Sequence, residues 1–163
     1  KDITVRKKTD GIAWGSVYAQ FLEVMENVSS QSNSLSVSRE LYKDKNKVST
    51  DELNIGDRIT VRLTVTSGRD MDFVQLKDER AACMEPIDVL SAYHWQNGFG
   101  YYQVTKDAST SFFFDRLRKG THILEYDVYV MSSGEYQEGV ATVQSMYAPE
   151  YIGHSDAIKL KVK

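Results

Sequence analysis

The feature that most constrains the fold is a strict alternation of apolar and polar residues near the middle of the chain. Between Arg58 and Thr66, four apolar residues, Ile59, Val61, Leu63 and Val65, alternate with charged or hydroxyl side chains. Successive side chains of a β-strand point to opposite faces, so this pattern predicts a strand with one buried face. It is the strongest strand signal in the chain.

Further segments repeat this pattern, and turn signals separate them. Alternation over 121–131 predicts a second long strand, the three phenylalanines of 111–115 a buried strand, and 141–146 and 158–162 two more. Asn97-Gly98 predicts a tight hairpin turn. About seven strands, with no convincing helix after residue 50, are typical of an all-β, immunoglobulin-like antiparallel β-sandwich.

The first 50 residues are harder to interpret. Asp2–Lys7 alternates and predicts a strand, whereas Ala13–Val28 fits a helical face and a strand equally well. Its β-branched and aromatic residues favour a strand. Leu35–Tyr42 alternates weakly, with Arg39 on the apolar side, and Lys43–Asp51 is charged enough to predict a linker or long loop.

Composition narrows the function classes. The 163 residues carry 20 basic and 23 acidic side chains, a net charge of −3, so no basic surface for nucleic acid is expected. No apolar run is long enough to predict a membrane span. Cys83 is the single cysteine, which excludes an internal disulfide and favours a small buried side chain. The absence of a starting Met and of a signal peptide predicts a piece of a longer protein.

No catalytic, metal or cofactor site is predicted. Zinc ligands need close spacing or a cluster made by the fold, and the histidines are far apart: His94, His122 and His154. Adjacent residues cannot converge as a hydrolase triad does, so His154-Ser155-Asp156 indicates a loop. Turn aspartates could hold calcium, but hairpins carry aspartates for backbone reasons: Asp70, Asp72 and Asp78. We therefore expect a protein that is not an enzyme.

Two groups of large side chains are candidate contact residues. One flanks the Asn97-Gly98 turn and the other flanks a proline; they are Trp95, Tyr101, Tyr102, and Met146, Tyr147, Pro149, Tyr151. Aromatic groups of this kind either fill a sandwich core or form a patch that contacts another domain. The sequence leaves both interpretations open.

Several ordered segments resemble the last macroglobulin-like domain of large bacterial α2-macroglobulins, the counterpart of the receptor-binding domain. They are Leu53–Leu63, Asp78–Pro86 with its Asp-x-Arg-Ala-Ala-x-x-Glu-Pro pattern, Ser91–Gln103, Phe112–Asp115 and Tyr147–Tyr151. Ala13–Tyr18 is similar to the CUB-like segment that precedes this domain, which favours strands near the N-terminus. The resemblance implies two parts: terminal strands of a CUB-like segment plus linker over 1–45, and a macroglobulin-like sandwich over 46–163.

The resemblance also implies a function. Such proteins lie in the periplasm or on the cell envelope and trap proteases, using a Cys-x-x-Gln thioester in another domain. Here Pro86 stands where the glutamine would follow Cys83, so this chain cannot form the thioester. The expected role is non-catalytic: packing near the thioester domain and taking part in its conformational change, with the other domains and the target proteases as partners. The alternative is a free-standing carbohydrate-binding or adhesin β-sandwich.

Overall fold

The computed structural model describes residues 4–17, 22 and 24–163, and almost all of its regular structure is β. The predicted central strand is present as β4 (Arg58–Ser67), and its four alternating apolar residues are fully buried. The second long alternation forms β10 (Gly120–Val130), which pairs with β4 in antiparallel register along ten residue pairs. These two strands are the centre of one sheet.

The strands form three sheets. The seven-stranded sheet has the order β1-β13-β12-β5-β9-β8-β7, with bounds Gln31–Ser32, Ile152–His154, Ala141–Ser145, Met71–Glu79, Ser109–Leu117, Phe99–Thr105 and Ala92–Gln96. The five-stranded sheet has the order β3-β2-β4-β10-β6, where β3, β2 and β6 are Asn46–Lys47, Leu35–Lys43 and Met84–Pro86. The two-stranded sheet pairs β11 (Gly134–Glu138) with β14 (Ile158–Val162).

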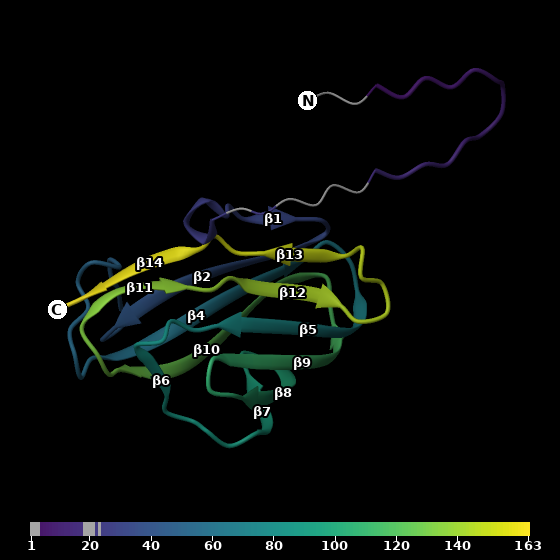
Figure 1. Cartoon of the computed structure of the whole chain (residues 1–163). Helices are drawn as coiled ribbons and strands as arrows, with labels where there is room; N and C mark the ends of the chain where they lie inside the picture. Colours follow the sequence, from purple (N-terminus) through teal and green to yellow (C-terminus); the bar gives the residue numbers. More distant parts are fainter. Residues whose placement is uncertain (1–3, 18–21, 23) are drawn as a thin grey trace.

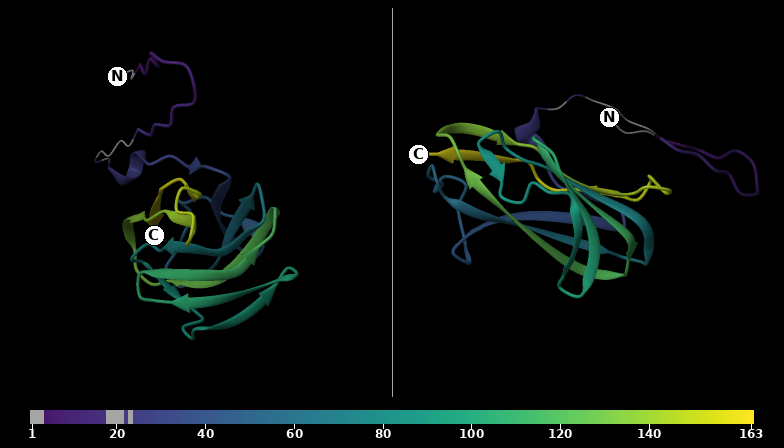
Figure 2. Two further views of the ribbon diagram at one scale, coloured as in Figure 1. Left: turned by 90° about the vertical axis from the view of Figure 1, so that its right-hand side faces the viewer. Right: turned by 90° about the horizontal axis from the view of Figure 1, so that it is seen from below.

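The two larger sheets pack face to face, and the pairings between these strands are antiparallel, as the sandwich prediction required (Figures 1 and 2). Phe112 and Phe114 of β9 are buried in the core. The Phe112 ring lies 5.8 Å from that of Tyr126 on β10, so aromatic packing joins the two sheets. No helix in the described part of the chain has the length and hydropathy of a membrane span.

The strand predictions near the N-terminus are wrong for the residues that the structure describes. Residues 4–7 and 13–17 belong to no strand, and their side chains are exposed. Within 22–28, the described residues include only a short 3-10 helix, η1 (Met25–Asn27). Residues 2, 3, 18–21 and 23, on which the same predictions fall, lie outside the described residues. Alternation alone does not make a strand, because a strand needs a neighbour to bond its backbone groups.

The boundary expected at residue 45 is also wrong, because β2 lies before it and belongs to the sandwich. β2 pairs with β4 from Leu35 to Tyr42, and Leu35, Val37 and Leu41 are buried. Its alternation was weak only because the inward position 39 is an arginine. The segment that was expected to be a linker contains the tight β2–β3 turn instead.

Side chains cover the outer edge of β10, where β6 pairs only with residues 128–130. The side-chain oxygen Oε1 of Gln96 accepts a hydrogen bond from the Glu125 N–H at 2.9 Å. The Asn97 side chain donates to the Ile123 carbonyl at 2.9 Å. The predicted Asn97-Gly98 turn thus closes the β7–β8 hairpin and also anchors it to the opposite sheet.

The stretch between β12 and β14 carries the short strand β13, which the sequence indicated only as a loop. β13 fits between β1 and β12 and crosses close to β2. A Cβ placed at Gly153 would overlap the backbone carbonyl of Leu35. Only glycine allows this approach.

We therefore expect Gly153→Ala to lower the free energy of unfolding by about 1–3 kcal/mol, because backbone atoms cannot move aside as a flexible side chain can. Urea denaturation of the purified chain measures this. Gly15→Ala is the matched control: a Cβ there meets no atom within 4 Å, and the change should stay within about 0.5 kcal/mol. An equal effect of both substitutions would contradict the explanation.

Candidate functional site

Met146 and Tyr147 lie on the surface, at the turn that follows β12. Their exposed fractions are 54% and 80%. The Tyr147 ring contacts Phe73 edge-on, with 5.2 Å between ring centroids, and the Met146 N–H donates to the Phe73 carbonyl at 2.9 Å. These two large side chains are therefore not needed to fill the core.

The remaining residues of this group have different environments. Pro149 is exposed in the turn, and its carbonyl accepts a hydrogen bond from Gln144 at 3.4 Å. Tyr151 is half-buried against the core, and its hydroxyl accepts a hydrogen bond from Arg69 at 2.9 Å. Pro149 shapes the turn and Tyr151 anchors it, which leaves Met146 and Tyr147 as its free contact groups.

The other candidate group divides between surface and core. Trp95 is 78% exposed, and its indole lies over Gly100, where an added Cβ would come within 2.9 Å of the ring. Tyr102 is partly exposed on the same side of the hairpin. Tyr101 is only 2% exposed and packs against Phe112, so its inclusion as a contact residue is wrong. Alternation along β8 would have placed it inward.

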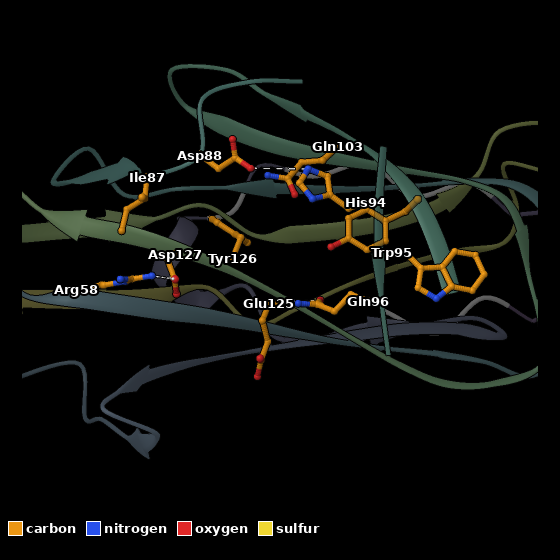
Figure 3. A pocket seen from close by; sticks show the side chains of 11 residues that line it. Arg58, Ile87, Asp88, His94, Trp95, Gln96, Gln103, Glu125, Tyr126 and Asp127 are labelled. Carbon is orange, nitrogen blue, oxygen red and sulfur yellow. Dashed lines mark hydrogen bonds and ion pairs between the residues drawn. The ribbon is translucent and has the colours of Figure 1, made fainter. Parts of the chain in front are cut away.

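A pocket of about 360 Å³ lies between β7 and β10, beside Trp95 (Figure 3). Its lining is mostly polar and includes Asp88, His94, Gln96, Gln103 and Glu125. The His94 ring stacks on Tyr101 with 5.7 Å between centroids, and its Nε2 lies 3.8 Å from an Asp88 carboxylate oxygen. Carboxylates, amides and an adjacent aromatic ring suit a small polar ligand such as a sugar.

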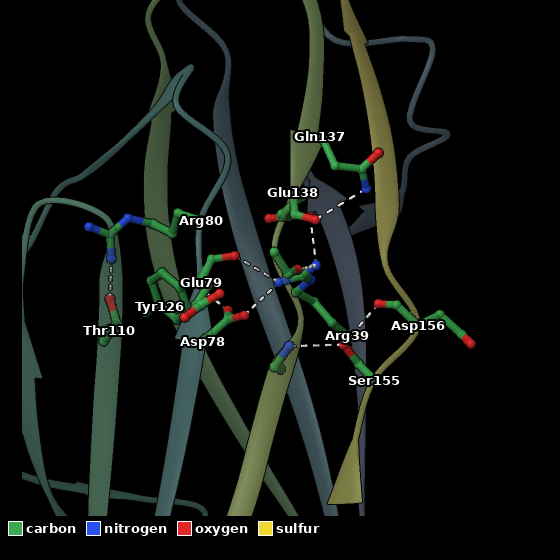
Figure 4. Close-up of polar contacts among 12 residues, drawn as sticks. Arg39, Asp78, Glu79, Arg80, Thr110, Tyr126, Gln137, Glu138, Ser155 and Asp156 are labelled. Atoms are coloured by element: carbon green, nitrogen blue, oxygen red, sulfur yellow. Dashed lines mark hydrogen bonds and ion pairs between the residues drawn. The ribbon is translucent and has the colours of Figure 1, made fainter. Parts of the chain in front are cut away.

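A cluster of buried charges, which was not predicted from the sequence, lies inside the sandwich (Figure 4). Arg39 of β2 donates to Asp78 of β5 at 2.6 Å, and both side chains are fully buried. The other Asp78 oxygen accepts a hydrogen bond from the Tyr126 hydroxyl of β10 at 2.7 Å. Glu138, at the end of β11, lies 3.1 Å from the Arg39 guanidinium. The cluster thus joins strands of all three sheets.

The Glu138 carboxyl is the member of this cluster that lacks a hydrogen-bond partner among the described residues. The two terminal nitrogens of Arg39 also donate to the backbone carbonyls of Glu79 and Gly139, at 3.2 and 2.5 Å, while its Nε has no partner among the described residues. Neither Glu138 oxygen accepts a hydrogen bond with good geometry from the described residues. Burial, together with the Asp78 charge and against the attraction of Arg39, raises the pKa of Glu138 to about 8. The raised pKa favours the protonated form of Glu138, while the charges of Arg39 and Asp78 balance each other.

The residues weighed as chemical sites do not assemble into one. Burial raises the pKa of the Cys83 thiol, which makes it a poor nucleophile. Ser155 bonds only to backbone atoms in its hydrogen bonds to Ala141 and Asp156, so it faces no histidine base. Asp70 caps a surface turn while Asp78 is buried in the ion pair. Within the described ranges, no three His, Cys, Asp or Glu side chains are grouped to hold a metal ion.

The family model of the bacterial α2-macroglobulin MG10 domain matches residues 35–150, which is more than half of the chain. The chain belongs to this family. The match begins at the first residue of β2, in agreement with the place of that strand in the sandwich. No curated protein sequence matches the chain.

Solved structures of bacterial α2-macroglobulins share the fold of this MG10 domain. A Salmonella α2-macroglobulin mutant, Y1175G, aligns with a TM-score of 0.72 and 19% identity over 83% of this chain and 10% of its own. Trypsin-activated α2-macroglobulin from Escherichia coli aligns with a TM-score of 0.71 and 18% identity, over 83% and 11%. The native Escherichia coli fragment from domain MG7 to the C-terminus gives 0.70 and 20%, over 82% and 24%. The chain thus spans about a tenth of the length of the full relatives.

The MG10 domain should lose stability as pH rises, because of Glu138. The folded chain holds this proton to about pH 8, whereas the unfolded chain releases it near the ordinary value of 4.5. The native state therefore binds more protons between these values, and the free energy of unfolding falls with rising pH by a few kcal/mol. Glu138→Gln, which keeps the neutral shape, should remove that slope in urea denaturation between about pH 5 and pH 8.

Glu135→Gln is the control, because Glu135 lies on the same strand in an exposed ion pair with Lys159. The free energy of unfolding of this variant should fall with rising pH as steeply as that of the wild type. A Glu138→Gln variant that keeps the full slope would show that another group is responsible.

Proposed function

We propose that this MG10 domain is a non-catalytic C-terminal domain of a protease-trapping α2-macroglobulin, packing near the thioester domain and taking part in its conformational change. α2-Macroglobulins are protease-trapping inhibitors. The observation that carries the proposal is the exposure of Met146 and Tyr147 at a turn shaped by Pro149. A solvated connector would carry small polar residues there.

The chemistry of this turn suits a contact that must form and later release. A methionine side chain adapts to an irregular surface, and a tyrosine offers a rigid ring with one polar end. Tyr151 and Arg69 hold the base of the turn in place. The contact groups are thus presented on a firm support without being part of the core.

We infer the partners and the cellular location of the domain from the same family. Its partners are the other domains of the parent chain and, through the parent, target proteases, in the periplasm or on the cell envelope. We assign the residues before β1 to the end of a preceding CUB-like segment. The domain itself contributes no catalysis, which agrees with its buried, unreactive Cys83.

Replacing Met146 and Tyr147 together by alanine should leave the melting temperature of the 163-residue chain nearly unchanged, because both side chains are exposed. In the full-length protein, the same pair should loosen the native state. Limited proteolysis would then convert the native protein to its cleaved form faster, and any thioester in the parent chain would be hydrolysed faster.

Tyr129→Ala with Met131→Ala is the matched control. This pair has the same composition and is also exposed, but Tyr129 lies near the end of β10 in the five-stranded sheet and Met131 directly follows that strand. It should leave the full-length protein unaffected. A large fall in the melting temperature of the Met146/Tyr147 variant would instead show that these side chains belong to the core, where truncating one costs about 2–5 kcal/mol.

Carbohydrate binding is a second candidate, favoured by one observation. The Trp95 indole lies against Gly100, is largely exposed and lines the polar pocket between β7 and β10. A glycan-array screen of the chain tests this function. Specific binding that Trp95→Ala abolishes would support it, and an empty array would reject it.

A further inference from the structure

A continuous row of uncharged residues crosses the outer face of the seven-stranded sheet. Strand register places these residues side by side, from one edge toward the other: Tyr93, Tyr102, Phe113, Gln75, Gln144 and Ile152. Their chain neighbours on the central strands are buried in the core, so the row itself faces outward. The Tyr93 and Tyr102 rings lie 5.7 Å apart.

Phe73 belongs to the same face because its backbone is in an unusual conformation. Its φ is +53°, in the left-handed region that bulky side chains avoid. Met71 and Val74 are buried, while Asp72 and Phe73 are both exposed, so the alternation of β5 reverses at this point. The pairing with β9 keeps its register through the reversal, so no residue is inserted. The local conformation alone turns the phenyl ring outward.

This ring connects the two groups of large surface side chains. On one side, the Phe73 carbonyl accepts the Met146 N–H at 2.9 Å, and its ring meets Tyr147. On the other side, the pairs Asp72–Arg116 and Val74–Phe114 flank the position of Phe73 and Asp115. The Asp115 carboxylate accepts a hydrogen bond from the Tyr93 hydroxyl at 2.8 Å. Phe73 therefore lies between the turn after β12 and the tyrosines of the β7–β8 hairpin.

We propose that Phe73 is the central anchor of one continuous docking surface on this sheet face, and that a neighbouring domain of the same polypeptide covers it. The inference rests on the proposed function, which it extends from Met146 and Tyr147 to Phe73, Phe113 and Tyr102. The left-handed conformation of Phe73 is strained, and its ring, which is 48% exposed, gains little burial within this chain that could offset the strain.

The nature of the occupant follows from two observations. The alignment covers only 10% of each of two Salmonella α2-macroglobulin chains, so the family places this domain among others of one polypeptide. The row itself carries no charge, which suits the apolar centre of a protein interface, where charged residues are depleted. Exposed aromatic residues of this kind are typical interface anchors.

Hydroxyl-radical footprinting of the full-length protein, compared with the 163-residue chain, tests the extent of the surface. We expect Phe73, Phe113 and Tyr102 to be protected together with Met146 and Tyr147, while Tyr129 stays as reactive as in the chain alone. Protection of Met146 and Tyr147 alone would overturn this inference and leave the proposed function standing. No protection of any of them would overturn both. Protection that appears in the chain alone as its concentration rises would identify a second copy as the occupant and overturn the inference.

Substitution of Phe73 separates docking from folding. Phe73→Gly relieves the left-handed strain, so the melting temperature of the chain should stay level or rise. In the full-length protein, the undocked fraction should increase about tenfold, as expected for loss of an interface anchor. Phe73→Tyr, which keeps the ring, should retain docking.

Lys45→Gly is the control for strain, because Lys45 has a φ of +68° in the β2–β3 turn, away from this sheet face. It should leave docking unchanged. A marked fall in the melting temperature of Phe73→Gly would show that the ring supports the fold, and unchanged docking would show that it is no anchor. Either result would overturn the proposal.

Discussion

The ion pair between Arg39 and Asp78 is the interaction on which the arrangement of the sheets depends. It joins β2 to β5 across the sandwich, Tyr126 adds β10, and Glu138 adds β11. A buried pair is costly unless nearly all of its hydrogen-bonding capacity is used. Here two backbone carbonyls accept hydrogen bonds from the terminal nitrogens of the arginine, and only its Nε lacks a partner among the described residues. The charges thus specify how the layers align, while the surrounding apolar residues supply most of the stability.

This division between buried charges and apolar residues explains which strands could be predicted from the sequence. β4 and β10 were predictable because a strand with one buried face must alternate. β2 gave a weak signal because Arg39 occupies an inward position that hydrophobicity would assign to solvent. The strands predicted near the N-terminus were wrong for the opposite reason. The apolar residues there alternate, but residues 4–17 pair with no sheet that could bond their backbone groups. Pairing partners are a property of the whole fold and cannot be read from one segment.

The candidate contact residues show the same limit of prediction from sequence alone. Large apolar residues around a proline indicated a shaped turn, and the turn indeed displays Met146 and Tyr147. Tyr101 and Tyr102 are adjacent in sequence, yet only strand alternation decides which one is buried. Phe73 carried no signal, because a left-handed backbone inside a strand leaves no mark on composition or spacing. Its position on the outer face depends on the conformation, and the conformation depends on the pairing of β5 with its neighbours.

The side-chain bonds along β10 have a consequence for the behaviour of the domain in solution. A strand with free N–H and carbonyl groups on its outer edge is a template on which another molecule can add a strand, and this is a common start of aggregation. Gln96 and Asn97 occupy the backbone groups of Glu125 and Ile123 at that edge. Two amide side chains from a hairpin of the opposite sheet thereby keep this sandwich from growing into a larger sheet with its own copies.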